Sequence, residues 1–361
     1  MKRLLIAFII LITITLVACG ENDEQTTEDH SEPTNGEQEE TASQESSAGT
    51  VVTSIYPLEF IISEIAGDVV DVETVIPPGA DAHTYEPSTR DMIDMSNHDA
   101  FFYVGNGLEV FADTLASTLE GEGVEAFALA DHEDHLFAEI TTDSHAENSH
   151  EDEDNHDHEN ENSHDDEHNH DHEDEHEHEH NHAHEDGELD LHFWLDPARM
   201  TQAGELILSQ LKEMYPDHAD TFDTNYESFS EQMNNLDQSF KSTLGDQQVD
   251  ILVAHEAFGY WEQEYGIQQH GIRGLSSSQD PSQKELQELF KTLQERNLNH
   301  VILEKNRDDS LAQTIADEFD LTIYELHSLE TITEDDIEQG ADYVDIMKNN
   351  LEVLEDTINQ D

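Results

Sequence analysis

The sequence predicts an α/β protein in which two lobes, each a parallel sheet with flanking helices, are joined by a long helix. Strand and helix patterns alternate from Val51 onward, and repeated strand–helix units imply parallel sheets covered by helices. A long helical pattern from His218 to Leu244 interrupts this alternation, which resumes at Val249. The interruption separates two sets of units, so it places a helix between two lobes.

The units before the long helix follow from short apolar runs. Val51–Ile55 predicts a strand, and the apolar spacing within Pro57–Ala66 predicts a helix that Gly67 ends. Further strands are predicted at Val70–Ile76, Ala100–Val104 and Val124–Leu129. A helix begins at Asp196-Pro197, because Asp is a preferred N-cap residue and Pro is favoured in the first turn.

The long helix and the units after it follow the same rules. Large apolar residues recur every three or four positions along the helix: Phe222, Tyr226, Phe229, Met233, Leu236 and Phe240. Strands are then predicted at Val249–Ala254, Val301–Leu303 and Leu321–Leu326, and helices at Pro281–Arg296 and Leu311–Phe319. The last helix carries Tyr343, Met347, Leu351, Leu354 and Ile358 at helical spacing.

The segment Asp131–Asp190 is rich in metal-binding side chains. It holds fifteen histidines and 26 acidic residues, and it contains no Lys or Arg. Imidazole suits Zn²⁺, Cu²⁺ and Ni²⁺, and carboxylate oxygens add further ligands. Because so polar a run cannot form a core, we expect a disordered insertion over 131–190 that binds metal weakly. The accessory weak metal sites are assigned to His156, His158, His164, His168, His170, His172, His176, His178, His180, His182 and His184.

The N-terminus predicts export and a lipid anchor. Lys2 and Arg3 precede an apolar run over 4–17, which is shorter than the ~20 residues of a membrane-spanning helix and typical of a secretory signal. Residues 16–19 (Leu-Val-Ala-Cys) resemble a bacterial lipoprotein signal, in which Cys19 is lipidated after a signal peptide at 1–18 is removed. Cys19 is the only cysteine, so no intrachain disulfide or thiolate metal site is expected. The anchor places the chain on the extracytoplasmic face of the bacterial cell membrane.

Composition divides the remaining chain. Residues 19–50 are acidic and polar, which predicts a disordered tether. We expect an N-terminal lobe at 51–217 carrying the insertion, an inter-lobe helix at 218–245 and a C-terminal lobe at 246–361. The formal net charge of −74 excludes binding of nucleic acid or anionic lipid through the protein surface.

Metal-competent residues fall where open α/β sheets bind ligands, beyond the carboxyl ends of strands. His83 follows the second predicted strand, and His255 directly follows the first strand after the long helix. Glu330 follows the last predicted strand, and His192 lies just before a predicted helix start. Taken singly, each would be an ordinary surface or capping residue, so the segments around them decide their interpretation.

Three segments surround the histidines: residues 78–87 (PGADAHTYEP), 192–197 (HFWLDP) and 255–260 (HEAFGY). In this order they resemble the metal motifs of bacterial zinc-binding ABC-transporter substrate-binding lipoproteins of the ZnuA/AdcA type. A His- and acid-rich insertion before the second motif is also typical of the zinc branch. The resemblance covers nearly all of the chain from Val51 onward.

This resemblance implies two lobes bridged by a rigid helix, with metal held in the cleft between them. It implies that His83, His192 and His255 are zinc ligands and that Glu330 takes the acidic fourth position, with water as the alternative ligand. The transported ligand would be Zn²⁺, and the partners would be an ABC permease and its ATPase. A monomer is expected.

The ligand types favour zinc independently of the resemblance. Three imidazoles and at most one carboxylate suit tetrahedral Zn²⁺ at roughly 2.0–2.2 Å. Manganese prefers more oxygen ligands, whereas Cu²⁺ and Ni²⁺ also bind imidazole, so selectivity depends partly on geometry and supply.

The sequence leaves two alternative functions to consider. A zinc-dependent hydrolase is disfavoured, because the chain has no His-Glu-x-x-His motif and no general base framed beside the ligands. Glu256 adjoins His255, but it is read equally well as a carboxylate that orients an imidazole. A surface metal buffer or adhesin without a transporter is the second alternative. We therefore expect a receptor and not an enzyme.

Overall fold

The computed structural model describes residues 47–132, 136–140, 188–245, 248–305, 307 and 309–358. The predicted signal peptide, Cys19 and the weak-site histidines from His156 to His184 lie outside these residues. Among the described helices, none has the length and apolarity that a membrane span requires.

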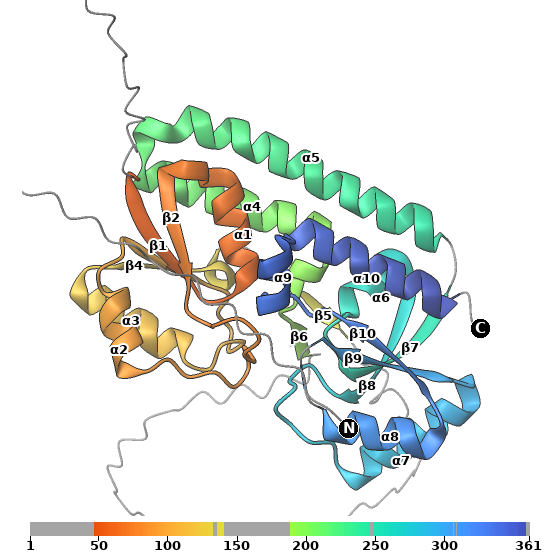
Figure 1. Ribbon diagram of the computed structural model, residues 1–361. Coiled ribbons are helices and arrows are strands. Elements are labelled where there is room, and N and C mark those ends of the chain that lie inside the picture. Colours follow the sequence, from red (N-terminus) through yellow and green to blue (C-terminus); the bar gives the residue numbers. More distant parts are fainter. Residues whose placement is uncertain are drawn as a thin grey trace, which may run out of the picture. The chain divides into compact units, whose positions relative to one another are not determined.

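Two four-stranded parallel sheets form the framework (Figure 1). The first has the order β2-β1-β3-β4 and consists of β1 (Gly49–Thr53), β2 (Val70–Thr74), β3 (Ala100–Tyr103) and β4 (Glu125–Ala128). The second has the order β10-β9-β7-β8 and consists of β7 (Val249–His255), β8 (Ile267–Arg273), β9 (His300–Glu304) and β10 (Thr322–Leu326). In each sheet the first strand along the chain is central and the second lies at an edge, so the two sheets share one topology.

Helices cover both sheets. Those of the first half are α1 (Tyr56–Ala66), α2 (Thr89–Met95), α3 (Ala112–Glu122) and α4 (Pro197–Met214). Those of the second half are α5 (Ala219–Leu244), α6 (Gly259–Tyr265), α7 (Gln283–Arg296), α8 (Ser310–Phe319), α9 (Glu334–Gln339) and α10 (Tyr343–Ile358). Helix α1 packs on β1 and β2, whereas α7 and α8 contact β8 and β9. The predicted start of α4 is confirmed, because the Asp196 side chain accepts a hydrogen bond from the Ala198 N–H at 2.8 Å.

Helix α5 connects the two halves, as the sequence predicts. It is 26 residues long, and it packs against α1 and α4 on one side of the fold and against α6 and α10 on the other (Figure 1). Its predicted apolar stripe is buried at Phe222, Phe229, Met233, Leu236 and Phe240. Helix α4 comes close to it at Gly204, where an added Cβ would lie 2.7 Å from the Phe229 ring. This continuous packing makes α5 a rigid link between the sheets.

Two short strands lie at the ends of the acidic tract, where the sequence predicts disorder over 131–190. Strand β5 (Ala138–Ile140) pairs antiparallel with β6 (Glu188–Asp190), and the neighbouring Leu136 and Phe137 are buried. The apolar side chains of Leu136 and Phe137 provide local burial at one of these ends. Strand β6 then leads directly to His192.

Candidate metal centre

The candidate residues stand at the ends of strands, where the sequence placed them. His83 lies in the loop after β2, next to the turn at Gly79, whose φ of +76° suits glycine. His255 is the last residue of β7, and Glu330 lies in the loop between β10 and α9. His192 follows β6 and precedes the short 3₁₀ helix Phe193–Leu195. Parallel strands bring their carboxyl ends to one edge of their sheet, which places His255 and Glu330 near each other after β7 and β10. His83 comes from the first sheet and His192 from the end of the antiparallel β5–β6 pair.

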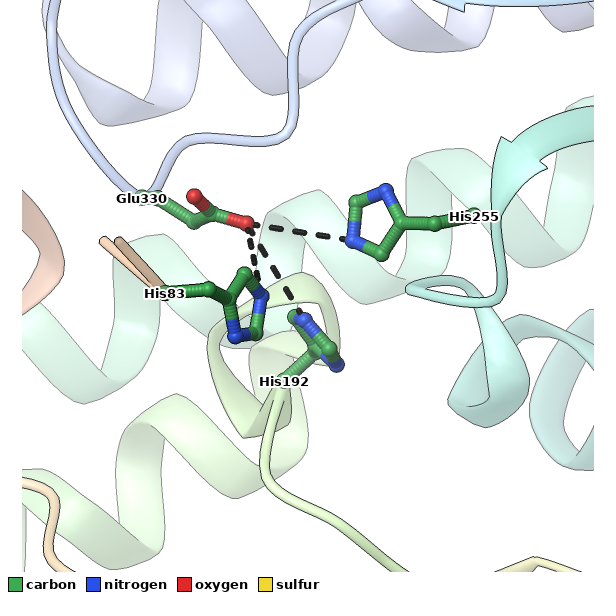
Figure 2. Close-up of side chains that lie close together, drawn as sticks. All are labelled: His83, His192, His255 and Glu330. Atoms are coloured by element: carbon green, nitrogen blue, oxygen red, sulfur yellow. Dashed lines mark ion pairs between the residues drawn. The ribbon is translucent and has the colours of Figure 1, made fainter. Parts of the chain in front are cut away.

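The four side chains point toward one common centre (Figure 2). Each offers a ligand atom, and these four atoms all lie within 4.8 Å of one another. The Oε1 atom of Glu330 is 3.5 Å from His83 Nε2, 3.8 Å from His255 Nε2 and 4.0 Å from His192 Nε2. Donors of a tetrahedral zinc ion are roughly 3.3 Å apart, so the three nitrogens lie about 0.2–0.7 Å farther from Glu330 Oε1 than they would around a bound ion.

The ligand atoms are buried and have no hydrogen-bond partner. His83 is 8% exposed, His192 and His255 are each 1% exposed, and Glu330 is 2% exposed. Within the described residues, all three Nε2 atoms and Glu330 Oε1 lack a hydrogen-bond partner. An unsatisfied buried polar atom costs about 1–3 kcal/mol. A cation at the centre would satisfy all four atoms at once, and the residues therefore fit a metal ion.

Two further carboxylates orient the imidazoles. His192 donates from its backbone N–H to Asp190 Oδ1 at 2.9 Å, and its Nδ1 lies 2.8 Å from the same oxygen. His255 Nδ1 lies 2.5 Å from Glu304 Oε1. With the proton held on Nδ1, the Nε2 lone pair of each ring faces the centre. Such partners fix both the tautomer and the direction of a metal-binding histidine.

Comparison of the sequence with protein-family models shows the family of the chain. The model described as "Zinc-uptake complex component A periplasmic" matches residues 51–357, which is most of the chain. The chain belongs to this zinc-uptake component A family.

Named relatives agree with this assignment. The chain is 28% identical over 312 residues to the zinc-binding lipoprotein AdcA of Streptococcus pneumoniae, covering 86% of this chain and 56% of AdcA. The chain thus spans about half the length of that relative. It is also 28% identical over 309 residues to the high-affinity zinc uptake system protein ZnuA of Bacillus subtilis, covering 85% of this chain and 87% of ZnuA.

Solved structures of relatives have the same fold. The Zn(II)-bound ZnuA-like domain of S. pneumoniae AdcA aligns with a TM-score of 0.62 at 26% identity, covering 86% of this chain and 98% of that domain. The laminin-binding protein Lmb of Streptococcus agalactiae aligns with a TM-score of 0.64 at 23% identity, covering 86% and 99% of the two chains, and shows the fold alone. The predicted α/β architecture with its long connecting helix is therefore confirmed.

In this member of the zinc-uptake component A family, the carboxylates that hold His255 and His192 were not predicted from the sequence. The partner of His255 Nδ1 is Glu304, the last residue of β9. Asp190 was also missed as the partner of His192. Asp190 ends β6 two residues before His192, and this position was a usable signal, whereas Glu304 is distant in sequence from His255. Histidines outside the site pair elsewhere, such as His270 with Asp250 at 2.7 Å and His327 with Asp336 at 3.1 Å.

The carboxylates determine the charge state of the centre. Burial favours the neutral His255 ring, but the Glu304 carboxylate outweighs this effect and raises the pKa of His255. Burial also opposes ionisation of Glu330, yet the nearby His83, Arg307 and His255 hold its pKa well below the usual range. The acidic ligand is therefore ionised at neutral pH, whereas a metal ion must compete with protons for the Nε2 lone pair of His255.

Metal binding is expected to weaken as pH falls from about 7 toward 5, because imidazoles with a pKa near 6.5 must be deprotonated to ligate. Since the pKa of His255 is raised, proton competition begins at a higher pH than for a free imidazole. Competition titration of zinc against a chelator at stepped pH measures this dependence. The weaker tract sites should empty first. An affinity at the centre that stays constant over this range would indicate oxygen-dominated coordination.

Proposed function

We propose that the chain is the extracytoplasmic zinc receptor of an ABC importer. It binds Zn²⁺ through the Nε2 atoms of His83, His192 and His255 and the carboxylate of Glu330, and delivers the ion to a membrane permease powered by an ATPase. The observation that carries this proposal is the cluster of four buried ligand atoms without other partners. Three nitrogens and one carboxylate oxygen favour zinc over manganese.

Burial of the site supports a receptor over a hydrolase. A catalytic zinc centre keeps one coordination position open for water or substrate. Here four side chains converge, and each is less than a tenth exposed. The zinc-uptake family and the names of AdcA and ZnuA support the same interpretation.

The sequence features at the N-terminus complete the proposal. Cys19 would carry the lipid anchor after removal of residues 1–18, and residues 19–50 would form the tether. AdcA of S. pneumoniae is named a lipoprotein, which supports this assignment. The lobes would comprise 51–217 and 246–361 on either side of the helix at 218–245, in a monomeric protein.

Uptake of radioactive zinc by cells tests the transport role. Deleting the gene should abolish high-affinity uptake and slow growth in chelated medium, and restoring the chain should recover both. A strain in which uptake is unchanged while surface-bound zinc falls would favour the alternative of a surface buffer or adhesin.

Removing the tract is expected to abolish several weak zinc sites and leave one tight site. Side chains that are ordered only on metal binding lose conformational entropy at every site they form, so we expect each tract site to bind more weakly than a preformed centre. The deletion should span 141–187 and spare Asp190, with Ile140 joined to Glu188 through an Asn-Gly turn because these two residues pair across β5 and β6. Calorimetric zinc titration counts the sites. Loss of the tight site as well would place the ligands in the tract.

A further inference from the structure

One arginine contacts three carboxylates beside the metal centre. Arg307 follows β9, and its Nη1 donates a hydrogen bond to Glu304 Oε2 at 2.7 Å. Its Nη2 forms an ion pair with Asp81 Oδ2 and lies 3.9 Å from Glu330 Oε2. The side chain is 21% exposed, so most of this guanidinium is removed from solvent. All three carboxylate partners of Arg307 are also buried or partly buried.

Each of these carboxylates supports or supplies a proposed ligand. Glu304 uses its other oxygen to hold His255 Nδ1. Asp81 Oδ1 accepts the backbone N–H of His83 at 2.9 Å. Glu330 is itself the acidic ligand. Arg307 therefore contacts the carboxylates that support two ligands, His255 and His83, and it lies beside the carboxylate of a third ligand, Glu330.

The contact with Asp81 also joins the two sheets. Asp81 belongs to the loop after β2 of the first sheet, whereas Arg307 and Glu304 belong to the second. Ser277, in the loop after β8, donates a hydrogen bond of 3.2 Å to the same Asp81 oxygen. Arg307 is thus one of the contacts that hold the His83 loop against the second half of the fold, together with the Ala82 N–H bond to Glu330 Oε2 at 3.4 Å and the Thr331 hydroxyl bond to the Ala80 carbonyl at 3.2 Å.

Two opposite effects on zinc are expected from a cation at this place. Its charge repels Zn²⁺, but its planar fork holds carboxylates that would otherwise repel one another. Lysine keeps the charge but not the fork, because its ammonium is a compact point charge. The two effects can therefore be separated by substitution.

We propose that Arg307 is a positioning residue that holds the loop of His83, the partner of His255 and the Glu330 carboxylate in a ligand-ready arrangement, and that it thereby slows zinc release. This inference rests on the proposed zinc site.

Zinc release from the full mature chain, loaded with one equivalent of Zn²⁺ and mixed with excess chelator, tests the proposal. Arg307→Lys and Arg307→Gln should each accelerate the slow release phase by ~10–100-fold, the range seen when partners of metal ligands are lost. Arg273→Lys is the matched control: Arg273 and Arg307 both line a cavity of about 390 Å³, but Arg273 pairs with Asp309 and Asp280. The control should release zinc at the wild-type rate.

A second readout separates positioning from general stability. The visible spectrum of the Co²⁺-loaded protein reports ligand geometry, and it should change in both Arg307 variants but not in Arg273→Lys. A wild-type release rate or spectrum in Arg307→Lys, or slower release from Arg307→Gln, would overturn the proposal. If the neutral variant does not fold, the Lys variant decides. Absence of any slow phase in the wild-type chain would instead contradict the proposed zinc site.

Discussion

Alanine in place of His83, His192 or His255 is expected to abolish tight zinc binding. Each substitution removes one of at most four ligands and leaves the remaining ligand atoms buried without a partner. The loss should exceed the ~10–100-fold cost of removing a residue that merely orients a ligand. Glu330→Ala should cost less, because water can replace a carboxylate oxygen.

Isothermal titration with protein lacking 141–187 measures these affinities without the tract. His270→Ala is a matched control, because its imidazole pairs with Asp250 outside the site. Circular dichroism of each metal-free variant checks that it is folded. An unchanged affinity in any one ligand variant would remove that histidine from the centre.

The second large effect is expected for Glu304→Gln, which keeps the size of the side chain but removes its charge. His255 then loses the carboxylate that holds its Nδ1, and zinc affinity should fall ~10–100-fold at neutral pH. Glu304 also raises the pKa of His255, so its removal lowers that pKa and relieves proton competition. The affinity gap between wild type and variant should therefore narrow as pH falls from about 8 toward 6.

Glu256→Gln is the control for this experiment, because it removes a charge of the same sign one residue away from His255 and leaves the bond between His255 Nδ1 and Glu304 in place. Chelator competition at several pH values should show near wild-type affinity for this control. Equal losses for the two variants would show that local charge, and not the hydrogen bond to Nδ1, supports the site.

Local periodicity was sufficient to predict most of the framework. The stripe from Phe222 to Phe240 predicts α5 because a helix of this length must bury one face along its whole course. Strand β8 was missed, since its residues Gln268, Gln269 and His270 are polar at the edge of a sheet and show no apolar run. Helix α3 was missed although Leu115, Ala116 and Leu119 have helical spacing.

The site was predictable only in part. The strand-end positions of His83 and His255 and the motifs around them identified the candidate ligands. The roles of Glu304 and Arg307 were not predicted, because they depend on which strands lie side by side. Strand β9 lies beside β7 only in the folded sheet. A lateral pairing of this kind leaves no periodic signal along the chain.

The most direct test of the account is a crystal structure of the zinc-loaded protein lacking 141–187, with anomalous scattering measured at the zinc edge. We expect one strong anomalous peak among the Nε2 atoms of His83, His192 and His255 and the Glu330 carboxylate, at roughly 2.0–2.2 Å from each. A principal peak at any other position, or one contacted by fewer than three of these histidines, would contradict the assignment of the zinc centre.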